Sequence, residues 1–158
     1  MFVLARAVTY ATLFIGLLLI FVPSRVLSWS GFNPPAQIGI WQGAGMILGA
    51  TGATVALSCI LTFAFVGKGT PAPFDPPRRL VIRGPYRVVR NPMYLGAGLV
   101  LVGATLFYQS LALAGYTGLF LLTMHIFVVT YEEPTLRRTF GNDYEAYCGK
   151  VWRWWPRR

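Results

Sequence analysis

An arginine-rich segment at residues 78–96, RRLVIRGPYRVVRNPMYLG, is the clearest candidate for chemistry in this chain. Gly84 and Pro85 predict a turn there, because proline fixes φ and glycine tolerates backbone conformations that other residues resist. Asn91 and Pro92 predict the start of a helix, since asparagine is a favoured N-cap and proline is well tolerated at the first helical position. Free amide groups at that helix start, beside the arginines, would suit a charged, nucleotide-like cofactor.

A pair of adjacent carboxylates, Glu132 and Glu133, follows the last apolar segment. Negative charge at the C-terminal end of a helix is disfavoured by the helix dipole, so this pair requires a compensating partner. One interpretation is a solvated helix end in which the pair binds Arg137, about one turn further on. The alternative is that one of these carboxylates faces the candidate cofactor site.

The composition predicts an all-α polytopic membrane protein. The 158 residues are 55% hydrophobic and 12% charged, with a mean hydropathy of +0.54, which excludes an ordinary soluble domain of this size. The net charge of +9 comes from residues that flank apolar segments. The bilayer and its anionic headgroups are therefore the expected partner, and nucleic acid is not. The two cysteines predict neither a disulfide framework nor a metal site.

Apolar segments predict about four transmembrane helices and a helical C-terminal tail. Five glycines of the second segment lie at helical spacings that permit close helix packing. Pro23 is expected to end the first helix, and the two-residue connection 109–110 makes the last two helices an antiparallel hairpin. The predicted spans are residues 2–22, 37–66, 93–108 and 111–131, followed by short helices at 135–140 and 142–150.

The distribution of charge predicts the orientation in the membrane. Arginine and lysine are concentrated after the second and fourth spans, so both termini and residues 67–92 are expected on the cytoplasmic side. The acidic residues fall on that side as well, which places the candidate cofactor site at the cytoplasmic face. We expect a single domain, with two N-terminal helices in residues 1–66 and a cofactor-binding core in residues 67–158.

Three blocks of this sequence carry a family resemblance: GPYRVVRNPMYLG, YEEPTL and FGNDYEAYCGKVWRWWP. Their order and spacing resemble the isoprenylcysteine carboxyl methyltransferase family and, more broadly, the membrane methyltransferases that act on phospholipids and small thiols. The resemblance implies an enzyme that transfers a methyl group from S-adenosylmethionine to a small or lipid-like acceptor (a thiol, carboxylate or amine) entering from the bilayer. In-line methyl transfer needs alignment and desolvation more than an acid or base, so no catalytic residue and no metal are expected.

The same resemblance implies which residues face the cofactor. Glu132 is expected to contact it, while Glu133, Tyr144, Tyr147 and His125 remain open between packing and a place in the site. The other expected cofactor-binding residues precede or begin the third apolar helix: Arg78, Arg79, Leu80, Val81, Tyr86, Arg90, Asn91, Pro92, Met93 and Tyr94.

Two departures from the family pattern bear on the acceptor. Asn91 stands where a histidine is commoner, and it cannot carry a proton. Val128 stands where the prenylcysteine carboxyl methyltransferases have an arginine associated with the substrate carboxylate. This departure disfavours a carboxylate as the methyl acceptor and favours a thiol, an amine or a lipid head group. A nicotinamide-dependent reductase of the sterol reductase type is an alternative, but its members usually carry an aspartate where residues 95–103 hold no acidic residue. A non-catalytic scaffold would not need the glutamate pair and the arginines on one face.

Overall fold

The computed structural model describes residues 9, 12–31, 35, 37–63, 65 and 80–157. All regular structure in these residues is helical, which confirms the predicted all-α class. The elements are η1 (Ile15–Phe21), α2 (Val22–Trp29), α3 (Ile40–Thr62), η3 (Gly84–Arg87), α4 (Pro92–Tyr108), α5 (Leu111–Phe127), η4 (Val128–Glu132), α6 (Glu133–Phe140) and α7 (Asn142–Lys150).

Three helical stretches of the described chain are long and apolar enough to cross a membrane: Thr12–Trp29, Ile40–Thr62 and Leu111–Phe140. The fourth apolar helix, Pro92–Tyr108, has 17 residues. It is therefore about 26 Å long, somewhat less than the roughly 30 Å of a hydrocarbon core. The protein is thus an integral membrane protein that passes the bilayer several times, and the predicted count of four spans is approximate.

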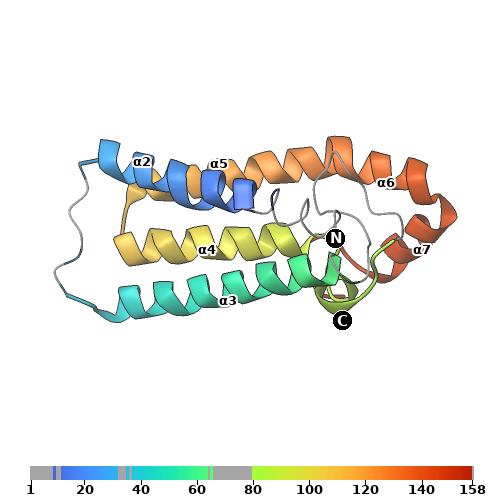
Figure 1. Ribbon diagram of the computed structural model, residues 1–158, viewed down its shortest axis with the longest axis horizontal. Coiled ribbons are helices and arrows are strands. Elements are labelled where there is room, and N and C mark those ends of the chain that lie inside the picture. Colours follow the sequence, from blue (N-terminus) through green and yellow to red (C-terminus); the bar gives the residue numbers. More distant parts are fainter. Residues whose placement is uncertain are drawn as a thin grey trace.

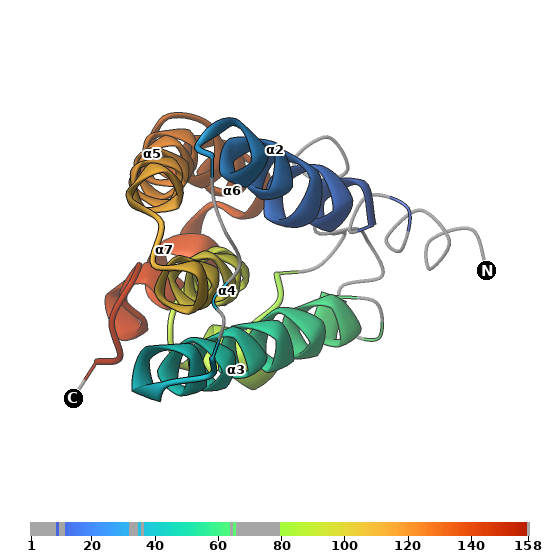
Figure 2. The same cartoon turned by 90° about the vertical axis from the view of Figure 1, so that its left-hand side faces the viewer.

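The long helices lie side by side, and α6 and α7 extend the bundle at one end (Figure 1). Figure 2 shows α4 between α3 and α5, with α2 beside α5. The chain turns at Gly141, so α7 leads back towards the start of α4 (Figure 1). The ends of α3 and α5, the start of α4 and the two short helices therefore meet at one end of the molecule.

Glycines let α3 and α4 pack with their backbones in direct contact. A Cβ atom added at Gly52 of α3 would lie 2.5 Å from the carbonyl oxygen of Gly96, and one added at Gly45 would lie 2.5 Å from that of Gly103. Backbone atoms cannot move aside as a flexible side chain can. The close packing that the glycine spacing predicts is confirmed, and it fixes α4 against α3 along its length.

Replacing Gly52 by alanine is expected to destabilise the protein by about 1–3 kcal/mol, because the new methyl group would overlap the backbone of α4. Gly49→Ala is the matched control on the same helix, since a Cβ there meets nothing within 4 Å. That control should be neutral or slightly stabilising, because alanine favours a helix over glycine. Thermal unfolding in detergent micelles compares the two, and equal effects would contradict this packing.

The prediction that Pro23 ends the first helix is wrong, and the predicted start of that helix lies outside the described residues. Helical backbone runs through Pro23 to Trp29. Preceding η1 is a π-helix in which the Val22 N–H bonds to the Leu17 carbonyl, five residues back. The next donor in that pattern would be Pro23, which has no N–H. The Tyr116 hydroxyl of α5 donates to the Leu18 carbonyl instead, at 2.8 Å, so the proline is accommodated.

The other predicted elements agree with the structure more closely. The second span is shorter than predicted, 23 residues in α3, while α4 and the 142–150 helix begin and end within a residue of their predicted bounds. The hairpin between α4 and α5 turns at Gln109, which adopts a left-handed conformation with φ of 49°. Ser110 then caps α5, because its side chain accepts a hydrogen bond from the Leu113 N–H at 3.3 Å.

Candidate functional site

A π-helical turn, η4, places the two adjacent glutamates. The Glu133 N–H bonds to the Val128 carbonyl five residues back, and Pro134 follows at the start of α6. Proline cannot donate to the preceding turn, so a widened turn before it relieves the conflict, and such turns are frequent at functional sites. Successive residues of a helix point about 100° apart. Glu132 and Glu133 therefore contact different partners.

Glu132 contacts the first turn of α4. Its Oε2 accepts a hydrogen bond from the Tyr94 hydroxyl at 2.9 Å. Among the residues that the structure describes, no arginine or lysine pairs with this half-buried carboxylate. The carboxylate thus keeps acceptor capacity for a further donor, and a cationic ligand group is the donor that would compensate its charge best.

Beside this carboxylate, Cys59, Val81 and Tyr86 form a buried cluster, against which Phe63 and Met93 pack. The rings of Phe63 and Tyr86 meet edge to face, with centroids 5.2 Å apart. Burial raises the pKa of Tyr86 well above its usual value, and the nearby Cys59 thiol and Glu132 carboxylate raise it further. The Tyr86 hydroxyl therefore stays protonated at neutral pH.

The helix α4 begins at Pro92, as its sequence predicts, but Asn91 does not cap it through its side chain. Asn91 is buried, and its Nδ2 donates to the Arg153 carbonyl at 3.4 Å. The N–H groups in the first turn of α4 are therefore left without a side-chain cap. They lie next to Tyr94, whose hydroxyl contacts Glu132.

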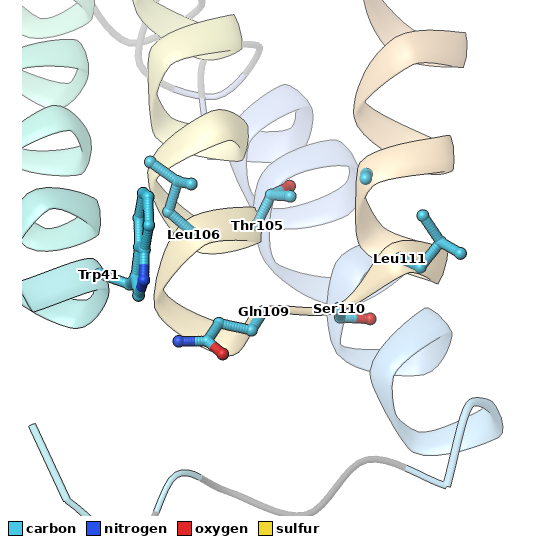
Figure 3. A pocket seen from close by; sticks show the side chains of 7 residues that line it. Trp41, Thr105, Leu106, Gln109, Ser110 and Leu111 are labelled. Atoms are coloured by element: carbon cyan, nitrogen blue, oxygen red, sulfur yellow. The ribbon is translucent and has the colours of Figure 1, made fainter. Parts of the chain in front are cut away.

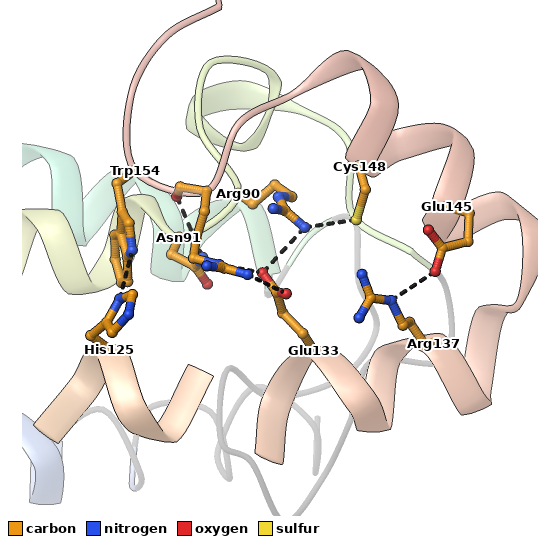
Figure 4. A network of polar contacts seen from close by, with 9 residues as sticks. Arg90, Asn91, His125, Glu133, Arg137, Glu145, Cys148 and Trp154 are labelled. Carbon is orange, nitrogen blue, oxygen red and sulfur yellow. Dashed lines mark hydrogen bonds and ion pairs between the residues drawn. The ribbon is translucent and has the colours of Figure 1, made fainter. Parts of the chain in front are cut away.

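Glu133 is the centre of a buried ion-pair network (Figure 4). Only 3% of the residue is exposed. The Arg153 guanidinium binds it through two hydrogen bonds, Nε to Oε1 at 2.7 Å and Nη2 to Oε2 at 2.8 Å. Arg90 adds a second cation, with Nη1 3.2 Å from Oε1. Arg137 instead pairs with Glu145 at 2.7 Å on the surface, so the interpretation that the glutamate pair binds Arg137 at a solvated helix end is wrong.

The structure divides the predicted cofactor-binding residues into two groups. Val81, Tyr86, Met93, Tyr94 and Glu132 surround one region, at the end of α3 and the start of α4. The second group faces the C-terminal part of the chain: Leu80 packs against Tyr144, Tyr147 and Val151, while Arg90 and Asn91 make the contacts given above. Pro92 is buried, and Arg78 and Arg79 lie outside the described residues.

The residues whose role the sequence leaves open, between packing and a place in the site, lie mainly around the second group. Tyr144 and Tyr147 are buried, and the Tyr147 hydroxyl donates to the Tyr86 carbonyl at 2.6 Å. His125 accepts a hydrogen bond at Nδ1 from the Trp154 Nε1–H at 3.1 Å. Cys59 and Phe63 belong to the first region, and sequence reasoning missed them. Neither carries a signal of its own, because both sit in an apolar helix end.

A cavity of about 390 Å³ lies at the other end of the bundle (Figure 3). Trp41 and the connection from Gln109 to Leu111 line it. It lies beside the last turn of α4, which contributes Thr105 and Leu106 to it, whereas Tyr94 is in the first turn. Of the polar side chains that line it, Ser110 caps α5 and Thr105 bonds to a backbone carbonyl of its own helix. The cavity is therefore separate from the region around Glu132.

The sequence of this chain matches a known protein family. The profile of the phospholipid methyltransferase family matches residues 40–143, which is more than half of the chain and runs from the start of α3 into α7. The chain belongs to the phospholipid methyltransferase family. Neither the curated proteins nor the solved structures gave a match.

Membership of this family confirms the broader of the two resemblances, and the narrower one to isoprenylcysteine carboxyl methyltransferases stays a prediction. Methyl transfer at a membrane is the activity that the family assigns to this chain. The matched residues include Tyr86, Tyr94 and both glutamates. Arg153, which binds Glu133, lies after the matched segment.

Proposed function

We propose that this protein transfers a methyl group from S-adenosylmethionine to a small or lipid-like acceptor at the membrane. The observation that carries the proposal is the Glu132 carboxylate, which Tyr94 holds beside the first turn of α4 and which no described cation neutralises. That carboxylate fits the ammonium group of the cofactor, since hydrogen bonds between charged groups are the strongest kind.

The surroundings of Glu132 fit the rest of the cofactor. The N–H groups in the first turn of α4, which no side chain caps, suit the carboxylate group of the cofactor. The rings of Tyr86 and Phe63 offer aromatic surface for the adenine or the positively charged sulfur. When bound, S-adenosylmethionine supplies an activated methyl group on a sulfonium centre. The protein's own contribution is to bind and orient the two reactants and to exclude water, and we assign no acid or base to the reaction.

Two arginines that the structure describes near the site, Arg90 and Arg153, support an acceptor other than a carboxylate. Arg90 and Arg153 both bind Glu133, so neither is available to neutralise an acid group of the acceptor. A thiol, an amine or a lipid head group needs no such cation. We therefore favour these three acceptor classes, with entry from the bilayer side.

Calorimetric titration of the purified protein in detergent tests the proposal. S-adenosylmethionine and its demethylated product, S-adenosylhomocysteine, should each bind with an affinity of about micromolar or tighter. Reduced nicotinamide dinucleotide should give no heat. Binding of the nicotinamide cofactor without binding of either sulfur compound would favour the reductase alternative and overturn the proposal.

The site is proposed to face the cytoplasm, because the basic residues cluster at its end of the bundle. Single cysteines at Ser30 and at Lys150, in a background without Cys59 and Cys148, should label from opposite sides of the membrane. Both positions are exposed. An impermeant thiol reagent applied to intact cells is expected to reach position 30 alone, and labelling of both positions from outside would contradict this orientation.

A further inference from the structure

The chain after α7, residues 151–157, crosses the start of α4 and is attached there at several points (Figure 4). The Arg90 N–H donates to the Trp152 carbonyl at 2.9 Å, and the Asn91 side chain donates to the Arg153 carbonyl. On the following residue, the Trp154 indole donates to His125 of α5. The chain around Arg153 is thereby attached to the two residues that precede α4 and, through the Trp154 side chain, to α5.

From this attached segment, the Arg153 side chain binds a single carboxylate, that of Glu133. Its two nitrogens meet the two oxygens of Glu133 in a fork, which defines the orientation of the carboxylate as well as its distance. Arg90 approaches one of the same oxygens from the residue before Asn91. Glu133 is therefore held in one orientation by two cations.

Glu132 and Glu133 hold the start of α4 from two sides. Glu132 contacts Tyr94, two residues after Pro92, and Glu133 contacts Arg90, two residues before it. The two glutamates are adjacent in a continuous helical backbone, so rotation of η4 about its axis turns both side chains together. Whatever fixes the rotation of this backbone at Glu133 therefore also sets the direction in which the Glu132 side chain leaves the helix.

We propose that Arg153 is a positioning residue, which fixes the rotation of η4 through its two-pronged pair with Glu133 and so aims the Glu132 carboxylate at the ammonium group of the cofactor. The inference rests on the proposed function, because it concerns the same cofactor site. It assigns to the C-terminal residues, which lie outside the matched family segment, a part in completing that site.

Binding of S-adenosylhomocysteine to Arg153→Ala tests the inference. Calorimetry, at a temperature at which every variant is fully folded, should show an affinity roughly tenfold weaker than that of the wild type, since small misplacements of a binding group are costly. Arg157→Ala is the matched control, because Arg157 is exposed in the same segment and has no ion pair among the described residues. Its affinity should equal that of the wild type.

A double variant separates positioning from simple stabilisation. If Arg153 acts through Glu133, Glu133→Gln combined with Arg153→Ala should bind no more weakly than Glu133→Gln alone. Fully additive losses would overturn the inference. Arg153→Lys keeps the charge but not the fork, and should bind more weakly than the wild type even if Arg153→Ala does not fold.

The failure of this inference can be told from the failure of the proposed function. A merely structural ion pair would lower the melting temperature of Arg153→Ala and leave the affinity of the folded protein unchanged, which would overturn the inference alone. Wild-type affinity in Arg153→Lys would overturn it in the same way. A wild-type protein that gives no heat with S-adenosylhomocysteine would overturn the proposed function, and this inference with it.

Discussion

Replacing Glu132 by glutamine should weaken the binding of S-adenosylmethionine at least tenfold. A hydrogen bond to a charged group contributes about 1.5–3 kcal/mol, and about 1.4 kcal/mol corresponds to a factor of ten in affinity. Glutamine keeps the shape of the side chain, and its carbonyl oxygen can still accept from Tyr94. Stability should change little, because Glu132 is half-buried and forms no ion pair among the described residues.

Two further variants serve as comparisons for the change in affinity of Glu132→Gln. Tyr94→Phe removes the donor but keeps the Glu132 charge, so its affinity should fall less than that of Glu132→Gln. Glu145→Gln removes an exposed carboxylate elsewhere on the same face and should leave the affinity unchanged. Calorimetry on folded samples gives all three values. Unchanged affinity in Glu132→Gln would show that the carboxylate is structural.

Replacing the neighbouring Glu133 by glutamine should instead lower the stability of the protein, by roughly 3 kcal/mol. The change leaves Arg90 and Arg153 without their shared carboxylate, and breaking a buried ion pair by removing one partner is strongly destabilising. We take the low end of the usual range because the Arg153 side chain is 31% exposed and thus partly solvated.

Glu145→Gln is the matched control for stability. Its ion pair with Arg137 has the same nitrogen–oxygen distance as that between Arg153 and Glu133, 2.7 Å, but both of its side chains are exposed. Water and salt screen such a pair, so its loss should hardly change the unfolding transition. Equal transitions for Glu133→Gln and Glu145→Gln, measured by thermal unfolding in the same detergent, would contradict the buried network.

Much of the fold could be predicted from the sequence, because its helix boundaries are marked by local signals. Pro92 marks the start of α4, and Gly141 separates α6 from α7 with a φ of 51°. Pro23 is the exception: a proline normally ends a helix, but here the Tyr116 hydroxyl satisfies a backbone carbonyl that the proline leaves free. That partner lies on another helix, 98 residues away, and no local pattern reveals it.

The site could be predicted only in part. The family resemblance named Tyr86, Tyr94 and Glu132, which the structure places together. It left the role of Glu133 open, because adjacent residues of a helix differ in direction by rotation about the helix axis and η4 sets that rotation. The partner of Glu133 was missed for a similar reason. Arg137 is close in sequence but pairs with Glu145, whereas Arg153 is 20 residues from Glu133 and reaches it through the tertiary fold.

A structure of the protein crystallised with S-adenosylhomocysteine in a lipid phase tests the central claim most directly. The amino nitrogen of the ligand should lie within hydrogen-bonding distance, about 2.7–3.2 Å, of the Glu132 carboxylate. Tyr86 and Tyr94 should line the same site, while Glu133 remains bound to Arg90 and Arg153. A ligand whose amino group contacts Glu133, or which binds away from both glutamates, would contradict the proposed site.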